Sequence, residues 1–118
     1  MATQQEITAA LADFRDRCNE NLRLRKMQRD WTKVLHIVAE DNDSRHTMTV
    51  VAGETRNVEE GLVGTPDIIV TTGSETLCDM FWGDLNPAQK YLSGELKLKA
   101  SQEDVMRLDA INLIIWPD

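Results

Sequence analysis

The stretch PDIIVTTGSETLCDMFWGDLNPAQKYLSGELKLK, Pro66–Lys99, decides the fold of this 118-residue chain. Its β-branched run over 68–71 predicts a short strand, because such residues fit a pleated, half-buried surface. Thr72-Gly73-Ser74-Glu75 then has the spacing of a helix capping box, and Leu, Met and Phe form one apolar stripe behind it. Gly83 is placed to end this helix, which we therefore predict over 74–82.

The second half of the stretch predicts a short helix and a strand. Asn86-Pro87 pairs an N-cap asparagine with a first-turn proline, so a helix begins there and ends at Gly94. The charged residues Glu95, Lys97 and Lys99 then alternate with Leu96 and Leu98, which is the period of a strand with one buried and one solvated side.

Upstream, the chain begins with helical patterns. Thr3-Gln4-Gln5-Glu6 repeats the capping-box spacing, and apolar residues follow at three- and four-residue steps to about Asn19, which predicts an amphipathic helix. Segment 22–30 predicts a second, shorter helix with a basic side formed by Arg25, Lys26 and Arg29.

Two β-branched-rich segments, 31–40 and 45–53, are joined by Asp41-Asn42-Asp43-Ser44 and predict a hairpin. With Asn42 and Asp43 as the central pair of the turn, Leu35 lies opposite Val50 and Ile37 opposite Met48 on one apolar face. Segment 54–65 is acidic and contains glycine, so we expect a connector there.

The last helix is expected to begin at Ser101 and contains few polar residues after Asp104. It is too apolar for a helix with one face in water. Three interpretations stay open: 111–116 is a buried strand, the helix is packed on both sides, or its second side touches a ligand or partner. Pro117 is expected to stop the helix.

The order of these elements predicts one α/β domain, of the α+β type, over residues 1–118. We expect a mostly antiparallel, five-stranded type of sheet covered on one face by helices. The hydrophobic share of 42% is that of an ordinary folded domain.

Charge and composition exclude some classes of function. The net charge of −7 argues against nucleic acid as a partner. The chain shows neither a membrane-spanning run nor the apolar segment of a signal peptide, so a cytoplasmic location is expected. Cys18 and Cys78 both fall at positions where a helix would bury them as free thiols.

Catalytic chemistry is also poorly supported. His36 and His46 do not meet in the predicted hairpin, and the chain contains no nucleophile elbow, phosphate loop, dinucleotide fingerprint or zinc motif. We expect no enzyme activity, no catalytic residue, no metal and no cofactor.

One resemblance covers nearly the whole chain and is strongest over 66–99. The ordered segments Pro66–Thr72, Glu75–Leu77, Gly83–Pro87 and Ser93–Leu98 resemble the sterol carrier protein type 2 family of lipid-binding domains. The chain departs from the family pattern at Tyr91, where a small residue is common, and at Ala100-Ser101, where a glycine is usual. Either departure could narrow a cavity.

The resemblance implies an apolar tunnel that binds fatty acids, acyl-CoA, sterols or similar lipids, and hence lipid transport by a transfer protein. Together with the apolar faces it predicts a lipid-binding set: Leu35, Ile37, Met48, Val50, Leu77, Met80, Phe81, Leu85, Leu96, Leu98, Met106, Ile111 and Trp116.

Two alternatives to a lipid carrier stay open. One is an interaction module whose cavity is filled by side chains, and the other is an accessory subunit that presents an isoprenoid or quinone intermediate to an enzyme. Arg25, Lys26 and Arg29 either form an ordinary solvated helix face or make transient contact with an anionic membrane.

Overall fold

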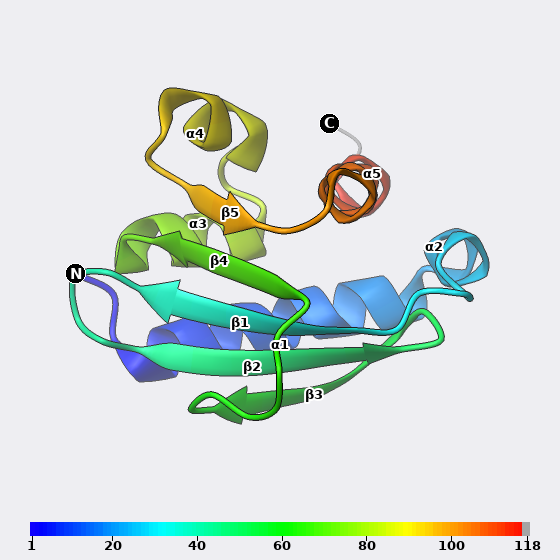
Figure 1. Cartoon of the computed structure of the whole chain (residues 1–118), viewed down its shortest axis with the longest axis horizontal. Helices are drawn as coiled ribbons and strands as arrows, with labels where there is room; N and C mark the ends of the chain where they lie inside the picture. Colours follow the sequence, from blue (N-terminus) through cyan, green and yellow to red (C-terminus); the bar gives the residue numbers. More distant parts are fainter. Residues whose placement is uncertain (117–118) are drawn as a thin grey trace.

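The computed structural model describes residues 1–116 and shows a five-stranded sheet with helices packed against it (Figure 1). This is the α+β class that the sequence predicts. The elements in chain order are α1 (Gln4–Glu20), α2 (Leu22–Met27), β1 (Lys33–Ala39), β2 (Arg45–Val51), β3 (Glu54–Glu60), β4 (Ile68–Thr72), α3 (Ser74–Trp82), α4 (Pro87–Ser93), β5 (Lys97–Lys99) and α5 (Gln102–Ile115).

The sheet is mixed rather than purely antiparallel. Its strand order is β3-β2-β1-β4-β5, and β4 runs parallel to β1 while the other neighbours are antiparallel. The reason is the segment between β3 and β4, which crosses the open face of the sheet before β4 begins (Figure 1). Two side chains of that face hold it: His36 Nε2 lies 3.0 Å from the Val63 carbonyl oxygen, and the Thr47 hydroxyl donates to the Gly61 carbonyl.

The expectation of a connector over 54–65 is wrong for its first half, because Glu54–Glu60 is strand β3. A tight turn at Ala52 and Gly53 (φ 51° and 80°) reverses the chain directly into it. This strand is at the edge of the sheet and exposes most of its side chains, so its composition resembles that of a loop. Only Thr55 is buried, where Asn19 of α1 exchanges two hydrogen bonds with its backbone.

The hairpin is present, but its register differs by two residues from the prediction. Leu35 lies opposite Met48, and Ile37 lies opposite His46. The centre of the turn lies one residue earlier in the chain than predicted. The Ala39 N–H donates to the Ser44 carbonyl, and Asp43 is in the left-handed region (φ 57°). A shift of two preserves the faces, so the predicted apolar face is the buried one, although it also carries His46.

The N-terminal helices follow the prediction closely. Thr3 and Glu6 form the complete capping box of α1, while α2 ends at Met27, short of the expected 30. Cys18 is buried, and burial raises the pKa of its thiol to about 12. Cys78 is only partly buried, which corrects the prediction for that residue.

Helix α3 occupies the predicted residues, but its cap is not local. Its N-cap is Gly73, and the Thr72 hydroxyl donates instead to the Glu95 carbonyl beside β5. The carboxylate of Asp41, from the β1–β2 turn, accepts hydrogen bonds from the Ser74 N–H (2.9 Å) and the Ser74 hydroxyl (3.0 Å). A remote turn therefore supplies the oxygen that the capping-box spacing assigned to Thr72.

This cap predicts an acid-sensitive component of stability. The hydrogen bond from the Ser74 backbone lowers the pKa of Asp41 below its model-compound value of 3.8. A carboxyl group whose pKa is lower in the folded state than in the unfolded state stabilises the fold at pH values above its unfolded-state pKa. This stabilisation is lost as the pH falls through the folded-state pKa. We expect the stability difference between the parent and Asp41→Asn to be largest at neutral pH and to shrink below about pH 4.

Urea unfolding at several pH values checks this expectation. Asp43→Asn is the matched control, since it removes a carboxylate from the same turn that makes no hydrogen bond to α3. A parent–Asp41→Asn difference that does not change between neutral and acid pH would contradict the assignment of the cap.

Helix α5 continues to Ile115, so the buried-strand interpretation of 111–116 is wrong. The expected stop at Pro117 lies outside the described residues. Only Asp104 and Ile111 of this helix are buried, and Met106 and Leu113 are each 65% exposed. Helix α5 lies beside the β5 edge of the sheet (Figure 1), and these two exposed side chains show that the core does not cover its whole apolar surface.

Candidate functional site

An apolar cavity of about 310 Å³ lies between the sheet and helices α3, α4 and α5. This volume is at the lower end of the range of about 300–1,000 Å³ that is usual for small-molecule sites. The sheet contributes Leu35, Met48, Val70 and Leu98; α1 and α3 contribute Phe14, Met80 and Phe81; α4 and the turn after it contribute Pro87, Ala88, Tyr91, Leu92 and Leu96; α5 contributes Val105, Met106, Leu108, Asp109 and Asn112.

The cavity has a buried floor and an exposed rim. On the floor, Leu35 and Met48 are each 2% exposed and are apolar. On the rim, Leu92 is 83% exposed and Tyr91 is 42% exposed, both on α4. A ligand with an apolar tail can therefore bury the tail against the sheet while its other end stays near water.

Polar groups are few and confined to the α4–α5 side. They are the Tyr91 hydroxyl, the exposed Asp109 carboxylate and the half-buried Asn112 amide. Asn112 donates to the Leu108 carbonyl of its own helix at 3.3 Å. Among the residues that the structure describes, no lysine, arginine or histidine lines the cavity.

Phe14 joins three elements at the inner end of the cavity. Its ring meets Phe81 of α3 edge to face, with centroids 5.1 Å apart, and lies 5.7 Å from the Trp116 ring at the end of α5. The amphipathic spacing of α1 places Phe14 toward the core, where it both packs and lines the cavity.

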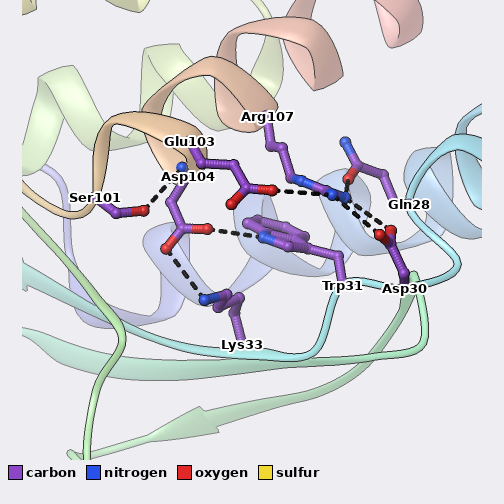
Figure 2. Close-up of polar contacts among 8 residues, drawn as sticks. All are labelled: Gln28, Asp30, Trp31, Lys33, Ser101, Glu103, Asp104 and Arg107. Carbon is purple, nitrogen blue, oxygen red and sulfur yellow. Dashed lines mark hydrogen bonds and ion pairs between the residues drawn. The ribbon is translucent and has the colours of Figure 1, made fainter.

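The first turn of α5 is tied to the start of β1 by a buried carboxylate (Figure 2). Asp104 is 3% exposed; it accepts a hydrogen bond from Trp31 Nε1 (2.9 Å) and pairs with Lys33 Nζ (3.4 Å). Its own backbone N–H is capped by the Ser101 hydroxyl. One side chain thus positions the wall of the cavity relative to the sheet.

One turn later, Arg107 forms a second tie (Figure 2). Its guanidinium donates to Gln28 Oε1 (2.8 Å) and to both oxygens of Asp30 (3.1 and 3.3 Å). Glu103, four residues earlier on α5, accepts a further bond at 3.3 Å. The guanidinium of Arg107 is therefore paired with carboxylates on the side of α5 that faces α2.

The other end of α5 is held by Trp116 against Gly83. A Cβ placed on Gly83 would lie 2.5 Å from two atoms of the indole ring, so the ring packs directly on the helix-ending glycine of α3. Indole Nε1 is buried without a hydrogen-bond partner among the described residues. Packing rather than hydrogen bonding therefore holds this end.

The structure brings part of the predicted lipid-binding set into the cavity. Predicted residues that line it are Leu35, Met48, Met80, Phe81, Leu96, Leu98 and Met106. Predicted residues outside the lining are Ile37, Val50, Leu77, Leu85, Ile111 and Trp116. Val50 and Ile111 instead border a small void of about 20 Å³ nearer α2, and Ile37 and Leu77 are sealed in the core.

The prediction omitted the α4 wall. Pro87, Ala88, Tyr91 and Leu92 all line the cavity, and none of them is buried. The signal available in the sequence was the adjacent Tyr91-Leu92 pair on a short capped helix. An apolar pair there contributes little to a core and marks an exposed apolar surface.

The histidines lie away from this cavity. His46 is fully buried between β2 and α1, with Nε2 2.8 Å from the Thr8 hydroxyl, and burial lowers the pKa of the ring. His36 is on the opposite face of the sheet, bound to Val63. No group of three or more potential metal ligands occurs within residues 1–116.

The basic side of α2 is partly neutralised. Arg25 pairs with Glu54 at 3.1 Å, whereas Lys26 and Arg29 are exposed. Membrane contact by these residues stays a prediction. In the described part of the chain, no helix has the length and apolarity needed to cross a bilayer.

Comparison with known proteins finds neighbours in structure but not in sequence. No protein-family model and no curated protein matches the chain. A solved structure named as the ubiquinone synthesis protein UbiJ-SCP2 is similar, with a TM-score of 0.71 and 16% identity over 92% of this chain and 95% of that one. A crystal structure of sterol carrier protein 2 has a TM-score of 0.68 and 15% identity over 91% and 93%.

A third neighbour is sterol carrier protein 2 like 2 from Aedes aegypti, with a TM-score of 0.65 and 15% identity over 90% of this chain and 95% of that one. A palmitated SCP2L2 from the same mosquito is also similar, with a TM-score of 0.56 and 16% identity over 86% and 93%. At these identities the likeness establishes the fold, which is that of sterol carrier protein 2.

Proposed function

We propose that this chain, folded like sterol carrier protein 2, binds lipids in the cavity and carries them or presents them to other proteins. The cavity with its buried apolar floor and exposed rim is the observation that carries the proposal. We propose that this cavity serves as the lipid site for which the sequence resemblance implies an apolar tunnel. The name of one structural neighbour, a palmitated SCP2L2, supports an acyl chain as the kind of ligand.

The energetics of tail burial fit this function. Each methylene removed from water contributes about 0.8 kcal/mol, so ten of them contribute about 8 kcal/mol. This gain is comparable with the cost of association, which is about 4–15 kcal/mol. Tail burial can therefore offset much of the cost of association, and binding by burial involves no covalent or acid–base step. We accordingly propose that the protein acts without catalysis.

A second candidate function is that of an accessory subunit that presents a lipid intermediate to biosynthetic enzymes. The match to a ubiquinone synthesis protein, at a TM-score of 0.71, favours it. The two functions differ in their need for a partner. A carrier transfers lipid between vesicles by itself, whereas an accessory subunit binds lipid but requires its enzyme for any effect. The open cavity argues against the third possibility, an interaction module filled by its own side chains.

Filling the cavity tests lipid binding directly. Ala88 is half-buried on α4 and lines the cavity, so the side chain of Ala88→Trp would occupy ligand space. We expect the affinity for a pyrene-labelled dodecyl chain to fall at least about tenfold, since several methylenes lose their burial. Native mass spectrometry of the parent should also detect co-purified lipid that the variant lacks.

Gln89→Trp is the matched control, because Gln89 is exposed on the same helix and does not line the cavity. Its affinity should stay within about twofold of the parent. Circular dichroism and urea unfolding verify that both variants fold. Equal affinities of Ala88→Trp and the parent would refute binding in this cavity.

A further inference from the structure

We infer that the rim selects ligands by the charge of their head group, and that Asp109 is the specificity-determining residue. Lipids whose head group is an uncharged hydrogen-bond donor are favoured over anionic acyl ligands of the same length. The inference rests on the proposed function and names the class of lipid that this cavity accepts.

The geometry of the cavity locates the head group. Its floor is formed by buried apolar side chains such as Leu35, Met48 and Val70, where a polar head would lose its hydration without any partner. The tail must therefore lie inside and the head at the rim. The polar groups of the lining are found on that side: Tyr91 on α4 with Asp109 and Asn112 on α5.

The rim carries a negative charge without a positive counterpart. Asp109 is exposed and bears the carboxylate of the rim. Among residues 1–116 it takes part in no ion pair. Three residues further along α5, on the same side of the helix, Asn112 adds only a neutral amide.

Neighbouring basic side chains are engaged elsewhere. Lys33 pairs with Asp104, and Arg107 pairs with Asp30 and Glu103. Lys90 of α4 pairs at 2.8 Å with Glu95, which follows the helix.

The two lysines of β5 also point away from the cavity. Leu98 of this strand lines the cavity, so by strand alternation Lys97 and Lys99 point to the opposite face. Lys97 also pairs with Glu40 there. A carboxylate or phosphate at the rim would therefore meet Asp109 with no cation between them.

Three ligands with the same undecyl tail and different head groups test the inference: 1-undecanol, dodecanoate and undecylammonium, titrated at neutral pH and low salt. The carboxyl carbon of dodecanoate belongs to its head group, so the contribution of the tail to binding is the same for all three. We expect the parent to bind dodecanoate at least about threefold more weakly than undecanol, and undecylammonium at least as tightly as undecanol. In Asp109→Asn, dodecanoate should bind about three- to tenfold more tightly and undecylammonium more weakly, with undecanol within about twofold.

Two controls separate a local charge from other effects. Asp43→Asn changes the net charge equally but lies in the β1–β2 turn, outside the cavity, and should preserve the parent's order of affinities. Raising the salt from about 0.01 to 1 M shortens the screening length from about 30 to 3 Å, so the spread between the ligands should narrow in the parent.

The outcomes distinguish this inference from the proposed function. If the parent binds all three ligands equally, or binds dodecanoate most tightly, charge selection is overturned while lipid binding stands. If Asp43→Asn tightens dodecanoate as much as Asp109→Asn does, the effect is one of net charge and the assignment to Asp109 is overturned. If none of the three ligands binds, the proposed function fails and this inference fails with it.

Discussion

Gly83→Ala is expected to destabilise the fold by about 2–5 kcal/mol, far more than the same change at another helix-ending glycine. Gly83 and Gly94 both follow a helix in the left-handed conformation, with φ of 84° and 86°. An added methyl group costs about 1 kcal/mol or slightly more at either position, because of the backbone alone. At Gly83 the new Cβ meets the Trp116 ring, at 2.5 Å, whereas at Gly94 no atom of residues 1–116 outside its immediate neighbours lies within 4 Å of the new Cβ.

The difference between the two variants therefore measures the packing of Trp116 on α3. Relief of the clash requires the indole to move, and the ring is also in contact with Phe14 at the inner end of the cavity. Urea unfolding of Gly83→Ala and Gly94→Ala gives the two free energies. In a Trp116→Ala background, Gly83→Ala should cost only about as much as Gly94→Ala, since the contact is already gone.

Equal destabilisation by the two glycine substitutions would contradict this account. So would an unchanged cost of Gly83→Ala in the Trp116→Ala background. In either case the end of α5 would not depend on its contact with Gly83, and the position of the cavity wall would have to be set by the first turn of α5 alone.

Asp104→Ala is expected to destabilise the fold by about 2–4 kcal/mol. Asp104 is 3% exposed, and its loss leaves the Trp31 indole N–H without an acceptor inside the protein. An unsatisfied buried donor costs about 1–3 kcal/mol. Loss of the Lys33 pair and of a carboxylate in the first turn of α5 adds the remainder, each contributing at most about 1 kcal/mol.

Glu103→Ala is the control for Asp104→Ala. Glu103 is the preceding residue in the same first turn and is 74% exposed, so its pair with Arg107 should contribute less than about 1 kcal/mol. Asp104→Asn should cost less than Asp104→Ala, because an amide oxygen can still accept from the indole. If Glu103→Ala and Asp104→Ala cost the same, the buried carboxylate does not anchor the helix.

The same variants connect stability to the proposed site. Helix α5 contributes Val105, Met106 and Leu108 to the lining, and its two ends are held by Asp104 and Trp116. A variant that loosens one end while the protein stays folded should weaken binding of the dodecyl probe. The cavity is thus shaped by contacts that lie outside its lining.

Features that depend on neighbours in the chain are the ones that the sequence determined. The caps at Thr3, Asn86 and Ser101 and the left-handed ends at Gly83 and Gly94 are all found where the residue types predicted them. Each of these signals involves atoms within about four residues, so no knowledge of the fold is required. The apolar face of the hairpin was also predicted correctly although the pairing register was not, because side chains alternate with a period of two and the register differs by two residues.

Features that depend on distant residues were decided by the tertiary structure. Thr72 has the local spacing of a cap, yet Asp41 takes that role because the β1–β2 turn lies beside the start of α3. The acidic composition of strand β3 is typical of a loop, and this segment is a strand because it pairs with β2.

The cavity shows the same division. The sequence indicated that α5 is too apolar to be an ordinary surface helix, and also that α3 presents an apolar stripe. It did not indicate that α4 would form the opposite wall, or that Asp104 would bind Trp31 from 73 residues away. Burial and hydrogen bonding between remote segments follow from how the layers pack. That packing is a property of the whole chain, which no local pattern of residues contains.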